Sequence, residues 1–387
     1  MRKILVSVAI SIAITVIITA AFFAFALWRS GQPQSAHFDA AYAQQHRGTV
    51  RVEIPEVYEM ANVALALSEY GRSQPQAVRR GSAYYERVMA HFEPHATHPF
   101  IEAIDIKPGD YGAFYGFREN ALRYRFEGTR IVRTAEYPNA WRPWPDRFTE
   151  LLSLAQDFAE ASKFRAFYMN EQGHYAALID DYETAVPVRE IWTWLEARFP
   201  ARYDAYRVVI SPLTGGSHST VRCADNDFEE TIMFVPAPAP AKEGESSASR
   251  EARMARMVFT EIDHNYVNPV TQRHMFSVYR FVRPLSAWNA QEGYGDPPST
   301  FNEYMTWGVF LLYARDTYDE EVFKQAFERE TRFMEESRRF VRFTSFSKTL
   351  LRLYPSGGEA RPIESIYPDV LGRMSAGDSP NSSTADS

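Results

Sequence analysis

The stretch of sequence that decides the fold reads Met257-Val258-Phe259-Thr260-Glu261-Ile262-Asp263-His264-Asn265-Tyr266-Val267-Asn268-Pro269. It belongs to a longer helical pattern over residues 253–266, in which apolar side chains recur every four residues at Met254, Val258, Ile262 and Tyr266. This pattern predicts an amphipathic helix with one buried stripe. Thr260, Glu261 and His264 share an adjoining stripe, so we expect them at the edge of the core, where a cleft would form.

The composition indicates a folding chain that does not bind nucleic acid. The chain has 387 residues, of which 45% are hydrophobic and 24% charged, so it has ample material for a large core. Its 42 Lys and Arg residues and 49 Asp and Glu residues give a net charge of -7, which provides no overall positive field for phosphates. The single cysteine, Cys223, excludes a disulfide framework and a CxxC metal site.

Residues 1–29 are predicted to form a transmembrane signal anchor. Residues 4–28 carry no charged side chain, and a helix of that length covers about 37 Å, more than the roughly 30 Å of a bilayer's hydrocarbon core. A cleavable signal peptide has a shorter apolar region of about 7–15 residues, so the length favours an uncleaved anchor. Arg2 and Lys3 outnumber Arg29 on the far flank, so we expect a single-pass protein of the cell membrane, with its C-terminal domain on the periplasmic or extracellular side.

The rest of the chain is predicted to form one α+β domain over residues 50–355, mostly helical with a small β-sheet. Helical patterns cover residues 55–70, 81–92, 146–161, 164–183, 188–199, 253–266, 300–315 and 319–343, and β-branched runs at 206–211 and 230–235 predict two strands. Polar residues 30–49 are expected to be a tether. A Pro/Ala alternation followed by small and charged residues predicts a flexible insertion at 236–250, and residues 356–387 are expected to be a largely disordered tail.

The quoted stretch resembles the zinc-binding helix of the zincin metallopeptidases. Residues 260–264 have the form of the HExxH motif, with Thr260 in place of the first histidine. Together with residues 265–269 they are similar to the HEFxHxFVNP signature of an uncharacterised bacterial family with a predicted secreted, zincin-like metallopeptidase domain. Further likeness at residues 52–67, 95–100, 208–216 and 302–312 covers most of the domain and implies a zincin-like fold.

The resemblance implies a metallopeptidase-like hydrolase and assigns roles to several residues. In zincins the glutamate of the motif is the general base that activates a zinc-bound water, so Glu261 would be the catalytic residue. His264 and, from a later helix, Glu303 would be the metal ligands. An extended peptide substrate would add as a strand to Val208, Val209, Ile210 and Ser211, which lead into Gly215 and Gly216.

Thr260 leaves one ligand position vacant, because a neutral hydroxyl is a poor zinc ligand and its side chain is too short to replace an imidazole. Three outcomes stay open. In the first, the fold binds peptide without a metal. In the second, Glu261 itself becomes a ligand in a rearranged site, as the Glu-x-x-His spacing of carboxylate-bridged sites allows. In the third, a distant histidine supplies the missing nitrogen, and His218 is the best candidate because it follows Gly215 and Gly216.

The sequence therefore favours a membrane-anchored, outward-facing metallopeptidase-related protein that acts on or binds extended peptide, with zinc as the expected cofactor if a metal is bound. The alternative is a metal-free peptide-binding or envelope-assembly module without catalysis, whose partners are a peptide or an envelope protein. A third hypothesis is a purely structural envelope protein with no cleft. Against every site hypothesis stands the interpretation that Glu261, Asp263 and His264 form the capped, salt-bridged edge of an ordinary surface helix. Convergence of Glu261, His264 and Glu303 on one volume would separate these hypotheses.

Overall fold

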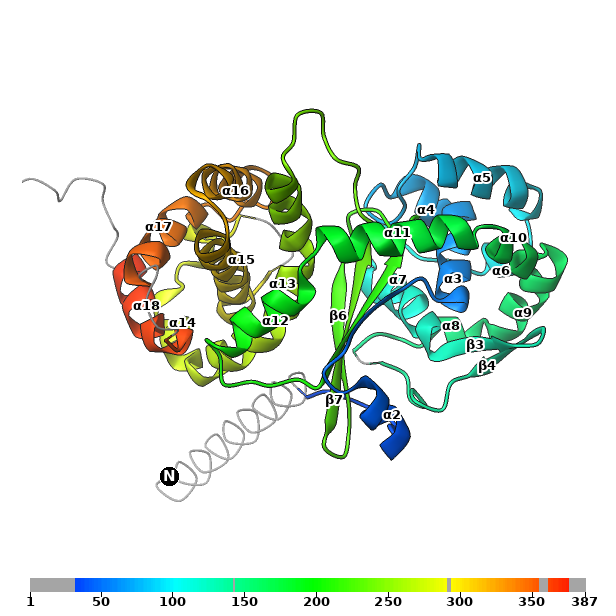
Figure 1. The fold of residues 1–387 in the computed structure, drawn as a ribbon, viewed down its shortest axis with the longest axis horizontal. Coiled ribbons are helices and arrows are strands. Elements are labelled where there is room, and N and C mark those ends of the chain that lie inside the picture. The colour runs from blue at the N-terminus through cyan, green and yellow to red at the C-terminus, as the bar shows by residue number, and fades with distance from the viewer. Residues whose placement is uncertain (1–31, 142, 291–293, 355–360, 376–387) are drawn as a thin grey trace, which may run out of the picture.

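A computed structural model describes residues 32–141, 143–290, 294–354 and 361–375. It is 59% helical with a small mixed sheet, which confirms the predicted α+β class. The described residues contain no helix that is long and apolar enough to cross a membrane, and the anchor predicted over residues 1–29 lies outside them. In Figure 1 the sheet stands between two groups of helices, α3 to α10 on one side and α13 to α18 on the other.

The strands are β1 (Gln34–Ser35), β2 (Val50–Glu53), β3 (Tyr124–Glu127), β4 (Arg130–Arg133), β5 (Ala205–Ser211), β6 (Ser219–Asp225) and β7 (Phe228–Pro236). In chain order, the helices begin with α2 (Ala40–His46), α3 (Glu56–Leu67), α4 (Glu69–Ser73), α5 (Ala83–Phe92), α6 (Pro99–Glu102), α7 (Tyr111–Arg118), α8 (Arg147–Glu150), α9 (Leu152–Ala161), α10 (Phe164–Asn170) and α11 (Gln172–Ala185). They continue with α12 (Val188–Glu196), α13 (Ser247–Arg273), α14 (Met275–Phe281), α15 (Pro297–Thr317), α16 (Glu320–Arg332), the π-helical turn η4 (Phe333–Ser337), α17 (Phe343–Leu353) and α18 (Tyr367–Ser375).

The larger sheet has the strand order β1-β6-β7-β5-β2. Its centre is the parallel pair β5 and β7, which correspond to the two strands predicted from β-branched runs. Side chains of alternate residues enter two different apolar clusters, because successive residues of a strand point to opposite faces. Val208 and Met233 belong to the cluster on one face, whereas Val209 and Ile232 belong to the cluster on the other. Both faces are therefore covered, which explains why these strands are almost continuously apolar.

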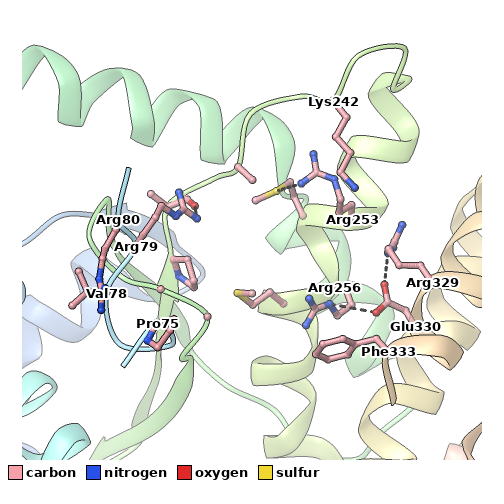
Figure 2. A pocket seen from close by; sticks show the side chains of 17 residues that line it. Pro75, Val78, Arg79, Arg80, Lys242, Arg253, Arg256, Arg329, Glu330 and Phe333 are labelled. Atoms are coloured by element: carbon pink, nitrogen blue, oxygen red, sulfur yellow. Dashed lines mark hydrogen bonds and ion pairs between the residues drawn. The ribbon is translucent and has the colours of Figure 1, made fainter. Parts of the chain in front are cut away.

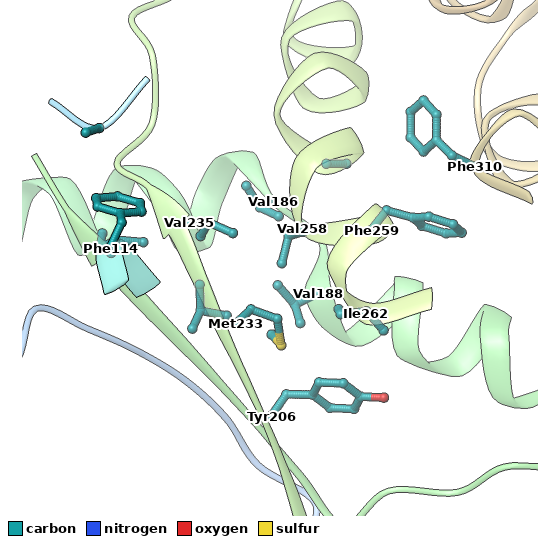
Figure 3. Packing of buried hydrophobic residues seen from close by; sticks show 14 of the residues in the cluster. Phe114, Val186, Val188, Tyr206, Met233, Val235, Val258, Phe259, Ile262 and Phe310 are labelled. Atoms are coloured by element: carbon teal, nitrogen blue, oxygen red, sulfur yellow. The ribbon is translucent and has the colours of Figure 1, made fainter. Parts of the chain in front are cut away.

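Helix α13 packs its predicted stripe against the sheet. Val258 and Ile262 are fully buried and face Met233 and Val235 of β7 (Figure 3). Phe259 points away from the sheet, toward Phe310 of α15, at 5.5 Å between ring centroids. The helix is longer than predicted, since it begins after the Ser246 cap and continues through Pro269 to Arg273. The loop before it covers only residues 237–246, and Arg253 holds this loop through two contacts with Glu245, each 2.7 Å long.

The prediction of a polar tether is wrong for residues 32–49. β1 pairs in parallel with β6, and the Asp39 side chain caps α2 by accepting a hydrogen bond from the Tyr42 backbone at 2.7 Å. Phe38 is 3% exposed and packs on Phe228 with ring centroids 5.2 Å apart. A short strand pairing, a few buried side chains and a helix cap fix this segment, although its average composition is polar.

The prediction of a disordered tail is wrong for residues 361–375. α18 and the turn before it bury apolar side chains at helical spacing, namely Ile363, Ile366, Tyr367, Val370, Leu371 and Met374. All of them belong to the main core cluster. The Ser-rich composition of the last residues of the chain does not extend to this helix.

Truncation of Leu371 tests whether α18 is part of the core. Leu371→Ala should lower the free energy of unfolding by about 2–5 kcal/mol, because it removes a fully buried side chain from a packed core. Arg373→Ala changes an exposed residue of the same helix and should alter this free energy by less than about 0.5 kcal/mol. Denaturant unfolding of the full-length chain measures both, and equally small effects would contradict the packing of α18.

Candidate functional site

Helices α13 and α15 bring together the three residues to which the zincin resemblance assigns roles. His264 Nε2 on α13 lies 3.6 Å from Glu303 Oε1 on α15. Glu261 lies almost one turn before His264 on α13, and its side chain is 6% exposed. Both glutamates are therefore largely removed from water, so their charges need partners within the protein.

His218 is the partner of Glu261. Its Nδ1 contacts Glu261 Oε1, and its backbone carbonyl accepts a hydrogen bond from the Tyr115 hydroxyl at 3.4 Å. Burial alone would raise the pKa of Glu261, but His218, His264 and Arg338 together lower it. The sequence predicted His218 as a substitute metal ligand beside His264, whereas the structure places it on the catalytic candidate itself.

The Thr260 hydroxyl is bonded within its own helix and not to this cluster of polar side chains. Thr260 is 1% exposed, and its hydroxyl donates a hydrogen bond to the Met257 carbonyl at 3.1 Å. Such a bond within one helix satisfies the hydroxyl locally. At the position where a zincin has its first histidine ligand, this chain thus has a hydroxyl that is already hydrogen-bonded to its own helix.

Arg338 is a member of the site that the sequence did not predict. It follows η4, and its Nη1 donates to Glu303 Oε2 at 2.7 Å while Nη2 donates to the Tyr294 hydroxyl. The guanidinium also lies over the Trp307 ring, 5.3 Å from the centroid. Arg338 therefore supplies the positive charge beside Glu303 that a metal ion supplies in a zincin.

The donor set of the described residues does not fit a zinc ion. No three His, Cys, Asp or Glu side chains within the described ranges are grouped as a metal ion requires. Glu303 is paired with Arg338, Glu261 with His218, and Thr260 offers no nitrogen. His264 and Glu303 are left as two adjacent donors, whereas structural and catalytic zinc sites use at least three protein ligands.

A cleft of about 510 Å³ opens beside His264. Thr220, Val221 and Arg222 of β6 line it on one side, and α13 lines it on the other with residues that include His264 and Asn265. The remaining wall includes Trp144 and Asn302.

Three buried polar atoms in the lining of this cleft have no hydrogen-bond partner among the described residues: Thr220 Oγ1, Asn265 Nδ2 and Asn302 Oδ1. An unsatisfied buried polar group costs roughly 1–3 kcal/mol, so native proteins normally complete it with water or a ligand. The three residues that line the cleft thus hold one hydroxyl, one amide donor and one amide acceptor that lack a partner among the described residues.

The prediction that Val208, Val209, Ile210 and Ser211 form a substrate-binding edge is wrong. β5 lies inside the sheet, since β2 pairs with Tyr206 to Val209 on one side and β7 pairs with the whole strand on the other. All four residues are fully buried. Gly215 and Gly216 line a different pocket, away from this cleft. The short strand β2 was not recognised in the sequence, and it covers the edge that β5 would otherwise expose.

The outer edge of β6 is the one beside the cleft. β7 pairs with β6 over Ser219–Asp225, but β1 reaches only Cys223 and Ala224 on the other side. Over Ser219–Val221, no strand of the described chain pairs with this outer side. An unpaired edge presents backbone donors and acceptors in the spacing that an added strand needs.

No protein-family model, no curated protein and no solved structure matches this chain. The resemblance of residues 257–269 to a zincin-like family therefore stays a prediction.

Zinc affinity should appear when a nitrogen ligand is restored and Glu303 is released. In Thr260→His/Arg338→Gln the new imidazole lies one turn before His264, and Glu303 no longer pairs with a guanidinium. We expect the double variant to bind zinc at least about a hundredfold more tightly than the wild-type chain, the scale on which zinc sites respond to their supporting groups. Competition with a chromophoric chelator measures this affinity.

The control is the same double variant with Glu303→Ala, which should lose the gain. Equal, weak binding by all three chains would contradict a zincin-like geometry at this helix. Tight binding by the wild-type chain would instead support the rearranged site, with Glu261 and His218 among the ligands.

Proposed function

We propose that this chain is a membrane-anchored, zincin-like, metal-free module that binds an extended peptide along the outer edge of β6. The observation that carries this proposal is the coincidence of an unpaired strand edge with three unpartnered buried polar atoms in one cleft. A peptide fits both features, because its backbone pairs with a strand and its amides pair with hydroxyl and amide side chains.

The rigidity of β6 supports recognition by strand addition. β6 pairs with β7 over seven residue positions, so its outer edge is held in a fixed geometry before a ligand arrives. A preformed edge lowers the entropy that binding must overcome. Thr220 and Val221 lie on this edge. Asn265 of helix α13 and Asn302 of helix α15 line other walls of the same cleft.

The pairing of the two site glutamates supports binding without catalysis. A general base must reach the attacking water, and a zincin base acts on a water that a metal has activated. Here Glu261 is engaged by His218, and Glu303 by Arg338. These contacts favour the metal-free hypothesis over the metallopeptidase hypothesis.

Peptide selection tests the proposal. Hexapeptides retained from a random pool on the immobilised full-length chain should bind in fluorescence anisotropy and should remain intact by mass spectrometry. N-methylation of alternate backbone nitrogens should weaken a selected peptide by at least about tenfold, because it removes main-chain donors that strand addition uses. Thr220→Val should weaken binding about fivefold through loss of one hydrogen bond.

Thr231→Val is the matched control, since Thr231 Oγ1 on β7 is also buried without a partner among the described residues but does not line the cleft. It should leave peptide affinity unchanged. Equal losses in both variants, or no effect of N-methylation, would contradict binding at this edge. Chelator-sensitive cleavage of a selected peptide would favour the metallopeptidase hypothesis.

We also propose that residues 4–28 hold this domain at the outer face of the membrane, because the uncharged stretch follows Arg2 and Lys3. A reporter enzyme that is active only after export should be active when fused after Ser387, and one that is active only in the cytoplasm should be inactive there. The chain should stay with membranes during a high-salt wash. The opposite reporter pattern would contradict the orientation, and release by salt would contradict the anchor.

A further inference from the structure

A second pocket, of about 680 Å³, lies on the other side of Glu261 along α13. Six cationic side chains line it: Arg79, Arg80, Lys242, Arg253, Arg256 and Arg329. Figure 2 shows Arg79 and Arg80 on one wall and Lys242, Arg253, Arg256 and Arg329 on the other. None of its lining residues lines the cleft beside β6, so this site is independent of the proposed peptide function.

Only two carboxylates neutralise these six cations. Arg253 pairs with Glu245, and Arg256 and Arg329 share Glu330 at 3.6 and 2.6 Å. The other three cations form no ion pair within the described part of the chain, although Arg79 and Arg80 donate to backbone carbonyls. The pocket therefore carries a formal excess of four positive charges in a chain whose net charge is -7.

The first wall of the pocket is fixed by backbone contacts. Val78 forms a β-bridge with Thr214, and the Arg79 backbone N–H donates to the Leu213 carbonyl at 2.7 Å. Gly215 is required here, because a Cβ at this position would lie 2.6 Å from the carbonyl oxygens of Pro75 and Gln76. The Arg79 side chain is held in turn by the Ala237 carbonyl, at 3.0 Å from Nη2.

The second wall offers cationic groups that are already partly desolvated. Arg256 lies over the Trp307 ring, 4.8 Å from its centroid, and burial lowers its pKa. Arg329 Nη2 is buried and has no partner among the described residues, although the other end of its guanidinium contacts Glu330. A buried guanidinium donor without a partner is costly, so an oxyanion placed there would satisfy it.

Apolar side chains complete the lining. Val78, Met254 and Met257 line the pocket together with the cationic groups, and Phe333 at the start of η4 is 39% exposed. We propose that this pocket binds a small phosphate monoester whose ester group is apolar or aromatic. The phosphate would lie among the guanidinium groups and the ester group against Met254, Met257 and Phe333.

The charge of the pocket favours a phosphate monoester over a carboxylate. A phosphate monoester carries about 1.5 to 2 negative charges at pH 7 and three acceptor oxygens, which match several guanidinium forks at once. A carboxylate carries one charge and two oxygens, so it would leave most of the excess charge uncompensated. Methionine side chains adapt to ligands of varied shape, which suits a small apolar group.

Calorimetric titration of the full-length chain in non-ionic detergent tests the proposal, with phenyl phosphate as the probe. Inorganic phosphate lacks the apolar group, and benzenesulfonate has a similar shape with a single charge. We expect saturable binding of phenyl phosphate that is at least about tenfold tighter than binding of either comparison compound. Arg79→Gln and Lys242→Gln should each weaken phenyl phosphate binding by at least about fivefold.

Lys242→Gln keeps the test decisive even if Arg79→Gln perturbs folding, because Lys242 is exposed and its ammonium forms no ion pair with a described residue. Arg125→Gln removes the same charge from the exposed end of the β3–β4 hairpin and should leave affinity unchanged. The proposal is overturned by absence of saturable binding, by equal affinity for benzenesulfonate, or by an equal loss in Arg125→Gln. Equal affinity for inorganic phosphate would overturn the assignment of an apolar group.

Discussion

Helix α13 packs against two layers at once, the sheet on one side and helix α15 on the other. Val258 and Ile262 meet β7, and Phe259 meets Phe310 of α15. Each such buried side chain contributes roughly 1.5–3 kcal/mol, so the rotation of the helix about its axis is fixed by apolar packing. Glu261 and His264 are then directed to the seam between the layers, where side chains from other elements meet them.

The polar side chains at this seam follow from that fixed rotation, because buried charges must find partners where the packing leaves them. Glu261 meets His218 from the segment before β6, and Glu303 meets Arg338 from the segment after η4. Asp263 is buried, and neither of its carboxylate oxygens has a partner among the described residues. Burial raises the pKa of Asp263 well above its usual value, and the neighbouring Glu261 and Glu303 raise it further. Three buried acids, Glu261, Asp263 and Glu303, thus share one region, and each of the two glutamates has a side-chain partner from another element.

Local pattern predicted the parts of the fold that depend on local burial. The four-residue repeat located the buried stripe of α13, and the β-branched runs located β5 and β7. Contacts between segments that are far apart in the sequence could not be predicted from local pattern. Apolar and charged side chains alternate in β2, but the run has only four residues, and its pairing along the edge of β5 depends on a segment about 150 residues away. Arg338 likewise meets Glu303 across 35 residues of chain. Composition gave wrong predictions for the segments around Phe38 and Leu371 for a related reason. An average over a polar segment hides the few buried apolar side chains that anchor it to the core.

The net charge of the sequence likewise does not reveal the cationic pocket lined by Arg79, Lys242 and Arg256. A net charge of -7 argues against a general affinity for polyanions, because that affinity depends on the field of the whole molecule. A pocket is governed instead by the groups within a Debye length, about 8 Å at physiological ionic strength. Its six cations come from residues 79–80, residue 242, the first turns of α13 and the end of α16. These four segments are spread over residues 79–329. Only the fold brings these segments together, so a cationic site arises in an acidic chain without any cationic stretch in its sequence.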